Sequence, residues 1–241
     1  MNEQLVRRLL DELSGFDISV TQHQAELLVS YLDLVIQKNK VVNLTRITNP
    51  EEAVTLHLVD SLLPLAVPGV QLDKKASLLD MGTGAGFPGV PLAVVSGAQA
   101  LLVDSVRKKT DAVNEFVAEL RLSSIQTCHA RLEELAREIP QSMDMVIARA
   151  VAQTNVLLEY ATPFLRTNGI LVVEKGRPDD EELRIAQRAA TTCGMKLVSR
   201  ETFELPQELG HREVLVYQRV AKPRIGLPRK VGLAKNKPLG L

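Results

Sequence analysis

The segment LLDMGTGAGFPGV, residues 78–90, is the feature that most constrains how this chain can fold. An apolar run ends at Asp80, and Gly82, Gly84 and Gly86 then alternate with other small residues. Glycine tolerates positive φ and lets a ligand approach the backbone closely. In an open α/β sheet, ligands bind at such strand-to-helix turns, beyond the carboxyl ends of the strands. The segment therefore predicts a strand, a glycine-rich bend at a ligand site, and a helix.

Short apolar runs alternate with helical segments after residue 68, which predicts a mainly parallel sheet with crossover helices. The last two apolar runs, MKLVSRETFEL and HREVLVYQRV, are separated only by the segment PQELG. This connection is too short for a crossover helix, so we expect an antiparallel hairpin there. The other expected strands cover residues 77–81, 100–104, 125–130, 145–150 and 169–174, and the helices between them cover residues 88–95, 108–121, 154–165 and 180–193.

The first 66 residues have a helical pattern. Leucines and valines between residues 5 and 13 recur at i, i+4 spacing, Thr21 with Gln24 resembles a capping box, and Asn49 precedes a proline and two acids as a helix N-cap does. We expect three units: a helical extension at 1–66, an α/β domain at 67–220 and a basic tail at 221–241.

The acid that ends the second expected strand indicates the kind of ligand. Asp104 follows Gly82 by 22 residues, where a carboxylate can accept hydrogen bonds from ribose hydroxyls. The frame 84–89 matches the G-x-G-x-x-G pattern of dinucleotide-binding folds, and a lone match is weak evidence. The frame 80–86, an acid followed by G-x-G-x-G, is similar to the first motif of S-adenosylmethionine-dependent methyltransferases. Only 23 residues follow Gln218, too few for a separate substrate domain, so the methyltransferase is favoured over an NAD-dependent oxidoreductase.

A series of segments along the chain resembles one family. From residue 39 onward the chain is similar to the bacterial small-subunit rRNA guanine-N7 methyltransferases (RsmG, also glucose-inhibited division protein B, GidB). The resemblance implies a class I, Rossmann-like fold with a seven-stranded, mainly parallel sheet and an antiparallel terminal hairpin. It also implies methyl transfer from S-adenosylmethionine to N7 of a guanine in the 16S rRNA of the 30S subunit. The segments, in chain order, are NLTRIT, HLVDSLLPL, LLDMGTGAGFPGVPLAVV, LVDSVRKKTDAVNEF, HARLEEL, IARAV, VVEKG and PRKVGLAKNKPL.

The same resemblance implies which residues contact the cofactor. Phe87 would lie beside the methionine arm or the sulfonium, whose charge an aromatic face favours. Leu132 and Glu133 would hold the adenine, and Arg149 would meet the cofactor or a phosphate. Asp80 and the glycines would lie by the methionine part. The complete expected set is Gly82, Gly84, Phe87, Asp104, Leu132, Glu133 and Arg149.

Motifs of other methyltransferases are missing from the sequence. Residues 148–151 read ARAV rather than the Asn/Asp-Pro-Pro-aromatic tetrad of exocyclic amino methyltransferases, and neither Cys128 nor Cys193 is near this point, as a cytosine-C5 nucleophile would be. Guanine N7 has a lone pair and no proton to lose, so a general base is dispensable. We therefore name no catalytic acid or base.

Three residues of the helical extension are candidates for the substrate pocket. His57 and Asp60 are spaced i, i+3 on the third expected helix, and Arg46 lies in the polar loop before it. The spacing by itself favours a hydrogen-bonded helix face, whereas the family resemblance implies a place near the guanine, and both interpretations stay open.

Other features bound the location and partners of the protein. Charges interrupt every apolar run at the N-terminus, so neither a secretory signal nor a bilayer span is expected. Isolated histidines and two distant cysteines predict neither a metal site nor a disulfide. We expect a cytoplasmic monomer. A ribosome-assembly factor that binds RNA without catalysis is the alternative from another functional class.

The C-terminal tail is strongly basic. Seven basic residues and no acid lie from Arg219 to Leu241, in a chain whose net charge is zero. A segment this rich in Pro, Gly and Lys cannot bury a core of its own. Its composition fits either a solvated end or an arm that contacts RNA phosphates. We expect deletion of residues 222–241 to weaken RNA binding and to spare cofactor binding.

Overall fold

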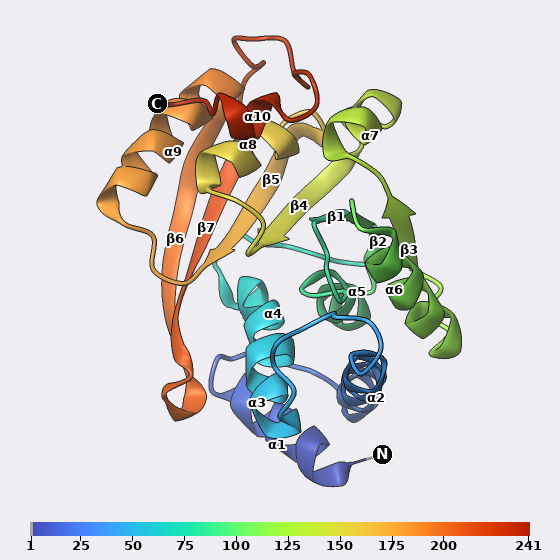
Figure 1. The fold of residues 1–241 in the computed structure, drawn as a ribbon. Helices are drawn as coiled ribbons and strands as arrows, with labels where there is room; N and C mark the ends of the chain where they lie inside the picture. The colour runs from blue at the N-terminus through green and yellow to red at the C-terminus, as the bar shows by residue number, and fades with distance from the viewer. Residues whose placement is uncertain (1) are drawn as a thin grey trace.

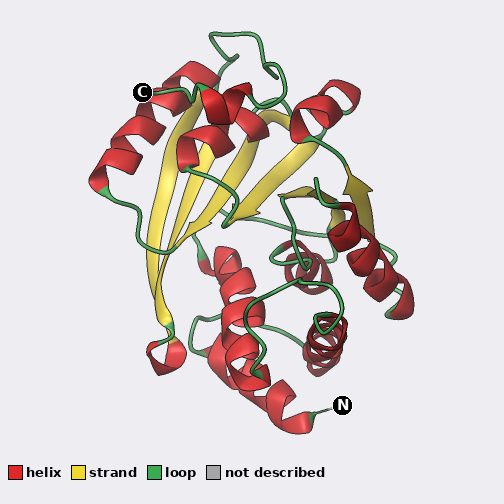
Figure 2. Cartoon of the chain, viewed as in Figure 1, coloured by secondary structure: helices red, strands yellow, loops and turns green. Residues whose placement is uncertain are grey.

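A twisted sheet with helices on both faces forms the centre of the molecule (Figure 1; Figure 2). The computed structural model describes residues 2–241. The strands are β1 (Ser77–Met81), β2 (Gln99–Asp104), β3 (Ile125–His129), β4 (Met143–Arg149), β5 (Leu165–Lys175), β6 (Met195–Leu205) and β7 (Gly210–Arg219). The α-helices are α1 (Glu3–Ser14), α2 (Gln22–Lys38), α3 (Pro50–Ala53), α4 (Asp60–Leu62), α5 (Gly89–Ser96), α6 (Arg107–Glu119), α7 (Leu132–Glu138), α8 (Thr154–Ala161), α9 (Asp180–Cys193) and α10 (Leu233–Asn236). A π-helical turn (Val54–Val59) joins α3 to α4, and 3₁₀ turns cover Leu63–Ala66 and Pro206–Glu208.

The sheet has the predicted topology. Its strand order is β3-β2-β1-β4-β5-β7-β6, with the first five strands parallel and β7 antiparallel to both β5 and β6. The terminal hairpin is confirmed. From β1 the chain continues to β2 on one side, and from β4 it continues to β5 on the other side. The topological switch point of the sheet therefore lies at the carboxyl ends of the adjacent strands β1 and β4.

The predicted elements differ from the observed ones mainly at their ends. β1 and α9 have the expected bounds, whereas β5 begins at Leu165 rather than at residue 169, and α8 ends at Ala161 rather than at residue 165. The chain therefore turns directly from α8 into a longer strand. The short helices α7 and α10 were not predicted, because seven and four residues carry too little periodicity.

The N-terminal helices begin where the capping signals indicate. Thr21 and Gln24 form the reciprocal capping box at α2, and the Asn49 side chain accepts hydrogen bonds from the backbone N–H groups of Glu51 and Glu52. These bonds satisfy donors that the first turn of a helix leaves unpaired. The sequence signals for these two helix starts are confirmed.

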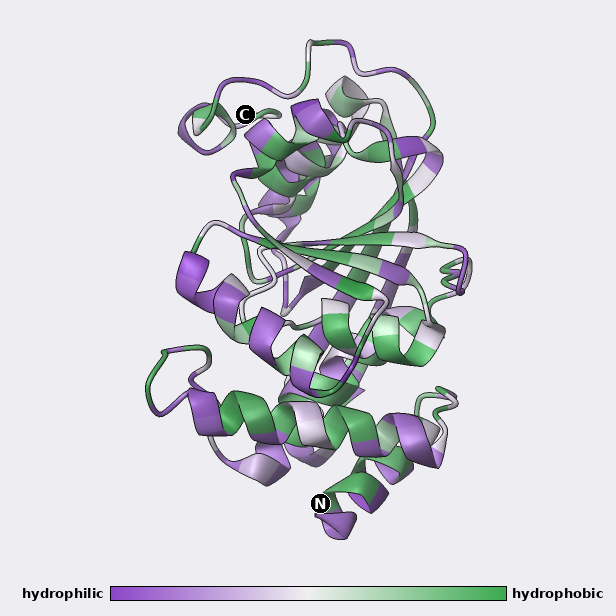
Figure 3. Cartoon of the chain, turned by 90° about the vertical axis from the view of Figure 1, so that its right-hand side faces the viewer, coloured by the Kyte–Doolittle hydropathy of each residue, from purple (hydrophilic) through white to green (hydrophobic). Residues whose placement is uncertain are grey.

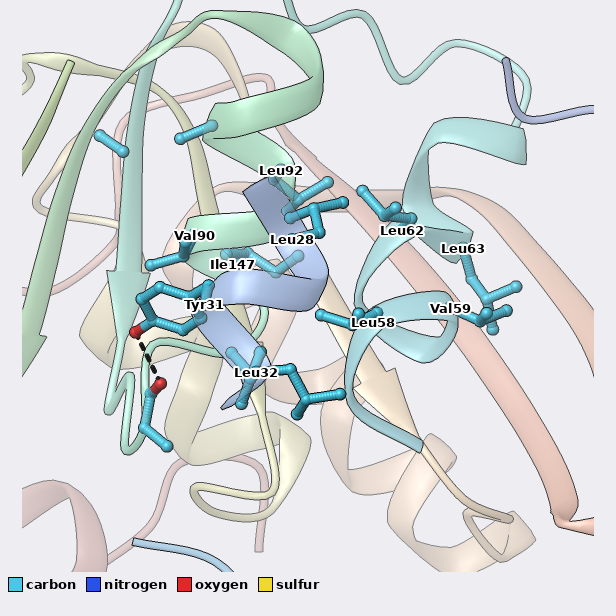
Figure 4. Packing of buried hydrophobic residues seen from close by; sticks show 14 of the residues in the cluster. Leu28, Tyr31, Leu32, Leu58, Val59, Leu62, Leu63, Val90, Leu92 and Ile147 are labelled. Carbon is cyan, nitrogen blue, oxygen red and sulfur yellow. Dashed lines mark hydrogen bonds between the residues drawn. The ribbon is translucent and has the colours of Figure 1, made fainter. Parts of the chain in front are cut away.

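The N-terminal helices share a hydrophobic core with the sheet. Leu28 and Leu32 of α2 and Leu58 of the π-helical turn are fully buried together with Val90 and Ile147 (Figure 4). Burial of each such side chain contributes roughly 1.5–3 kcal/mol. The helical extension is thus packed firmly enough to position side chains beside the strand ends.

The basic tail packs against the body of the protein. The Arg229 guanidinium donates to both carboxylate oxygens of Glu159 on α8, and the Asn155 side chain donates to the Leu239 carbonyl at 2.8 Å. Ala234 is buried. The tail crosses α8 and α9 at the end of the molecule opposite the N-terminal helices (Figure 1; Figure 3). Acidic and polar groups of α8 thus hold the tail against the body, while most of its basic side chains stay exposed.

Residues 2–241 contain neither a membrane-spanning helix nor a cluster of metal-ligating side chains. No helix there has the length and apolar character needed to cross a bilayer. In the same residues, no group of three or more His, Cys, Asp or Glu side chains is arranged to hold a metal ion.

Candidate functional site

The glycine bend after β1 is held in a conformation that needs glycine. Gly82 has φ of +73°, and a Cβ there would lie 2.7 Å from a methyl carbon of Val151. Gly86 has φ of +90°, and its Cβ would overlap the Tyr31 hydroxyl. That hydroxyl donates to the Ala85 carbonyl at 2.8 Å (Figure 4). Side chains at these positions would break the bend, because both the torsion and the space exclude them.

Asp80 braces the bend from inside. Its Oδ2 accepts from the Thr83 hydroxyl at 2.6 Å and from the backbone N–H of Gly89 at 2.9 Å. Burial raises the pKa of Asp80 to about 6, against the lowering effect of these hydrogen bonds. Its carboxylate thus links the start of the bend to the start of α5. The structure gives Asp80 a bracing position, and it lines neither of the two pockets described below.

A pocket of about 230 Å³ opens beside the bend, and we call it the glycine pocket. Asp104 ends β2 on its wall and is only 8% exposed. Its two oxygens accept from the backbone N–H groups of Gly84 (3.0 Å) and Val106 (2.8 Å). Each oxygen keeps a second lone pair for a ligand hydroxyl. The lining residues are Gly82, Val103, Asp104, Ser105, Lys109, Ala130, Arg131, Leu132, Glu133, Ala150, Val151, Tyr160 and Lys235.

The start of α7 and the tail together close the far wall of the glycine pocket. Leu132 and Glu133 open α7, and Glu133 is buried. Its Oε1 accepts a hydrogen bond of 2.8 Å from the backbone N–H of Gly232 in the tail. Lys235 of α10 lines the same pocket. The tail is thus part of this site.

A second pocket of about 500 Å³, the arginine pocket, lies between the ends of β4, β5 and β7 and the π-helical turn. Arg149 Nη1 lies 3.0 Å from Asp60 Oδ2, and Arg212 Nε lies 2.9 Å from Asp60 Oδ1. Arg149 Nε is 3.6 Å from Glu174 Oε2. These charges come from segments far apart in the sequence. The lining residues are Ile47, Leu56, His57, Asp60, Arg149, Ala150, Glu174, Lys175, Gly176, Arg177, Pro178, Glu182 and Arg212.

The His57 ring, which lines the arginine pocket, stacks on the buried ring of Phe87. Their ring centroids are 4.6 Å apart and their planes differ by 2°. His57 Nε2 is 2.8 Å from the Thr45 hydroxyl. Burial lowers the pKa of His57 to about 3, and the charge of Arg149 acts in the same direction. The ring is therefore neutral at neutral pH, which makes it a packing and hydrogen-bonding group there.

The structure divides the expected site residues into three groups. Gly82, Asp104, Leu132 and Glu133 line the glycine pocket, whereas Arg149 lines the arginine pocket with His57 and Asp60. Gly84 supports Asp104 through its N–H, Phe87 packs under His57, and Arg46 is exposed; these three line neither pocket.

Sequence analysis did not identify several lining residues. Glu174 lies in the segment VVEKG, and Arg212 lies in the second strand of the hairpin. Glu174 directly follows the apolar run ILVV, and this was the available signal, whereas Arg212 lies among polar residues at the start of β7 and gave none. Lys235 gave no such signal, because one lysine in a basic tail is not distinctive.

Comparison with known proteins gives the family. The family model described as GidB, rRNA small subunit methyltransferase G, matches residues 24–210. The chain belongs to the GidB family. Among curated relatives, it is 38% identical over 236 residues to the ribosomal RNA small subunit methyltransferase G of Desulfitobacterium hafniense (strain Y51), covering 97% of this chain and 94% of that protein. The protein of the same name from Carboxydothermus hydrogenoformans is 35% identical over 227 residues, covering 93% and 95%.

Solved structures confirm the fold of this GidB-family protein. The fibrillarin of Aeropyrum pernix, crystallised with natively bound S-adenosyl-L-methionine, superposes with a TM-score of 0.54 at 14% identity, over 66% of this chain and 73% of that one. A SAM-dependent methyltransferase from Aquifex aeolicus superposes with a TM-score of 0.53 at 15% identity, over 70% of this chain and 93% of that one. The expected class I fold is confirmed.

Proposed function

We propose that this GidB-family protein transfers a methyl group from S-adenosylmethionine to N7 of a guanine in the 16S rRNA of the 30S subunit, in the cytoplasm where ribosomes assemble. The observation that carries the proposal is that Ala150, directly after β4, lines both pockets. A donor in one pocket and a base in the other would meet at this residue. Proximity and alignment of two reactants account for a large part of enzymatic rate enhancement.

The glycine pocket fits the methyl donor. Asp104 has free lone pairs for the two ribose hydroxyls, and Leu132 and Glu133, which line the same pocket, would hold the adenine and its amine. At Gly82 a side chain would collide with Val151 on the pocket wall, so the backbone itself forms the surface for the methionine part. Bound there, S-adenosylmethionine would supply an electrophilic methyl group on a sulfonium.

The arginine pocket fits a purine base and its phosphate. The residues around it carry both charges: Arg149, Arg212, Lys175 and Arg177 against Asp60, Glu174 and Glu182. Arginines bind phosphate and base acceptors, and carboxylates tolerate the positive charge that the base acquires on methylation. The N7 lone pair forms the new N–C bond as the S–C bond breaks, so no proton has to be removed. The neutral His57 is compatible with this chemistry, since no general base is needed.

The test is methyl transfer from radiolabelled S-adenosylmethionine to 30S particles that lack the modification. Cleavage chemistry selective for 7-methylguanine then locates the label. We expect label at one cleavable guanine, and none with an Asp104→Ala variant. Cofactor binding without label on 30S particles or naked 16S rRNA would contradict the proposal and favour a non-catalytic ribosome-assembly factor. Nicotinamide dinucleotide that outcompetes S-adenosylhomocysteine would favour the oxidoreductase.

A further inference from the structure

Glu174 is a buried carboxylate whose two oxygens have no hydrogen-bond partner among residues 2–241. It is the last residue but one of β5, opposite Arg149 of β4 in the sheet register, and it is only 3% exposed. The distance of 3.6 Å to Arg149 Nε is too long for a hydrogen bond. Buried polar groups in native proteins nearly always have partners, because an unpaired one costs free energy. Glu174 therefore indicates a ligand that brings its own donors.

The other two carboxylates of the arginine pocket are already paired. Asp60 accepts from two arginines, one at each oxygen. Glu182 accepts from the backbone and hydroxyl of Thr154 and lies 2.7 Å from the Lys175 amine. Among the described carboxylates of the arginine pocket, Glu174 is thus the one for which neither oxygen has a hydrogen-bond partner, and the wall of this pocket at Ala150 is shared with the glycine pocket.

We propose, on the basis of the function above, that Glu174 recognises the target base by accepting hydrogen bonds from N1–H and N2–H of guanine. These donors are side by side on the Watson–Crick edge, and a carboxylate accepts both with its two oxygens. Adenine has an unprotonated N1 there, which would face the carboxylate with a lone pair. N7 belongs to the other ring and stays free for methylation.

The surrounding charges fit this role. Burial raises the pKa of Glu174 well above its ordinary value, and the negative charges of Asp60 and Asp80 act in the same direction. Arg149 and Arg212 oppose this shift. Two donors on the bound guanine would stabilise the ionised carboxylate. Recognition of the base and ionisation of Glu174 would then favour each other.

The test exchanges the hydrogen-bonding pattern without changing the size of the side chain. Glu174→Gln keeps one acceptor and places an amide donor against the donors of guanine, whereas an amide pairs well with the edge of adenine. Methyl transfer is measured on 30S particles reconstituted with 16S rRNA that carries guanine or adenine at the mapped position. We expect kcat/KM on the guanine particles to fall at least tenfold. We expect the guanine-to-adenine ratio to fall at least tenfold as well.

A control variant separates recognition from folding. Glu181→Gln makes the same chemical change on the exposed face of α9, where Glu181 pairs with Arg184, and should leave the ratio and kcat/KM unchanged. Calorimetric binding of S-adenosylhomocysteine should be within twofold of wild type in both variants. A purely structural role for Glu174 would lower activity on both particles and leave the ratio unchanged, which would overturn the assignment.

A second measurement needs no protein variant. Inosine at the target position keeps N1–H and lacks the N2 amine, so wild-type kcat/KM should fall about tenfold for the loss of one hydrogen bond to a charged group. Undiminished transfer to inosine would overturn the assignment. Absence of transfer by wild type to guanine particles would overturn the proposed function, and this assignment with it. Transfer by wild type with an unchanged ratio in Glu174→Gln would overturn the assignment alone.

Discussion

The two pockets differ in how the chain builds them. The glycine pocket is formed largely by residues that follow three neighbouring strands in order, β1, β2 and β3. The arginine pocket combines the π-helical turn and the start of α4 with the ends of β4, β5 and β7. Its paired residues Asp60 and Arg212 are 152 positions apart in the sequence. A site made of consecutive strand ends leaves a compact signature in the sequence, whereas a site made by distant pairing does not.

The two chain ends also differ in their relation to these pockets. The N-terminal helices contribute Leu56, His57 and Asp60 to the arginine pocket, and the tail contributes Lys235 and the Gly232 N–H to the glycine pocket. Each end therefore completes one pocket. We therefore expect changes in the arginine pocket to affect base recognition or stability, and changes in the glycine pocket to affect cofactor binding.

The largest effect should follow from Arg149→Met. Arg149 is the side chain that faces both Asp60 and Glu174, so its removal leaves buried carboxylates under-compensated. We expect a loss of about 3 kcal/mol in the free energy of unfolding, measured by urea denaturation. Arg166→Met removes an exposed arginine from its pair with Asp144 and should cost under about 1 kcal/mol. Equal losses in both variants would show that the arginine pocket is not the charged network described.

Asp104→Ala should have the next largest effect, and on the other pocket. Two ribose hydrogen bonds to a carboxylate would be lost, so S-adenosylhomocysteine should bind about 100-fold more weakly, about 2.7 kcal/mol, by calorimetry. Asp111→Ala on the exposed side of α6 is the matched control and should bind as wild type. Unchanged affinity for S-adenosylhomocysteine in Asp104→Ala would contradict the assignment of the glycine pocket to the cofactor.

Much of the glycine pocket could be predicted from the sequence, and the features that could not be predicted have physical causes. Alternating glycines, the acid after β2 and the hairpin length are local patterns, and the structure has the corresponding bend, strand end and hairpin. The stacking of His57 on Phe87, 30 positions later in the chain, joins two distant segments, and no local pattern specifies it. The pairing of Arg212 with Asp60 depends on the register of β7 against β5, which no local pattern specifies.

The pH dependence of stability tests the arginine pocket further. His57 has a folded-state pKa of about 3 and an ordinary value of 6.5, so the unfolded chain binds more protons below about pH 6.5 and stability falls as the pH falls. Relative to His57→Gln, the wild type should lose about 2 kcal/mol between pH 8 and pH 5, since each pKa unit corresponds to about 1.4 kcal/mol. Denaturation curves across this range measure it.

His23 provides the comparison for this titration. It is exposed on α2, so His23→Gln should leave the pH profile of wild type unchanged. If the profile of His57→Gln coincides with that of wild type, the buried neutral ring does not account for acid sensitivity.

The smallest of these effects concerns the tail. Because Gly232 donates to Glu133 and Lys235 lines the glycine pocket, deletion of residues 222–241 should weaken S-adenosylhomocysteine binding about tenfold, about 1.4 kcal/mol. This replaces the expectation from sequence that the deletion would spare cofactor binding. Lys222→Ala, which removes one charge and keeps the tail, should bind as wild type. Full affinity for S-adenosylhomocysteine after the deletion would show that the tail takes no part in cofactor binding, and would favour its role as an RNA-contacting arm.

The most direct test of the two-pocket account is a crystal structure of the complex with S-adenosylhomocysteine. The account predicts the ligand in the glycine pocket, its ribose hydroxyls on the Asp104 carboxylate and its sulfur directed toward Ala150, with the arginine pocket left open to the base. A ligand that fills the arginine pocket, or one whose ribose does not contact Asp104, would contradict it.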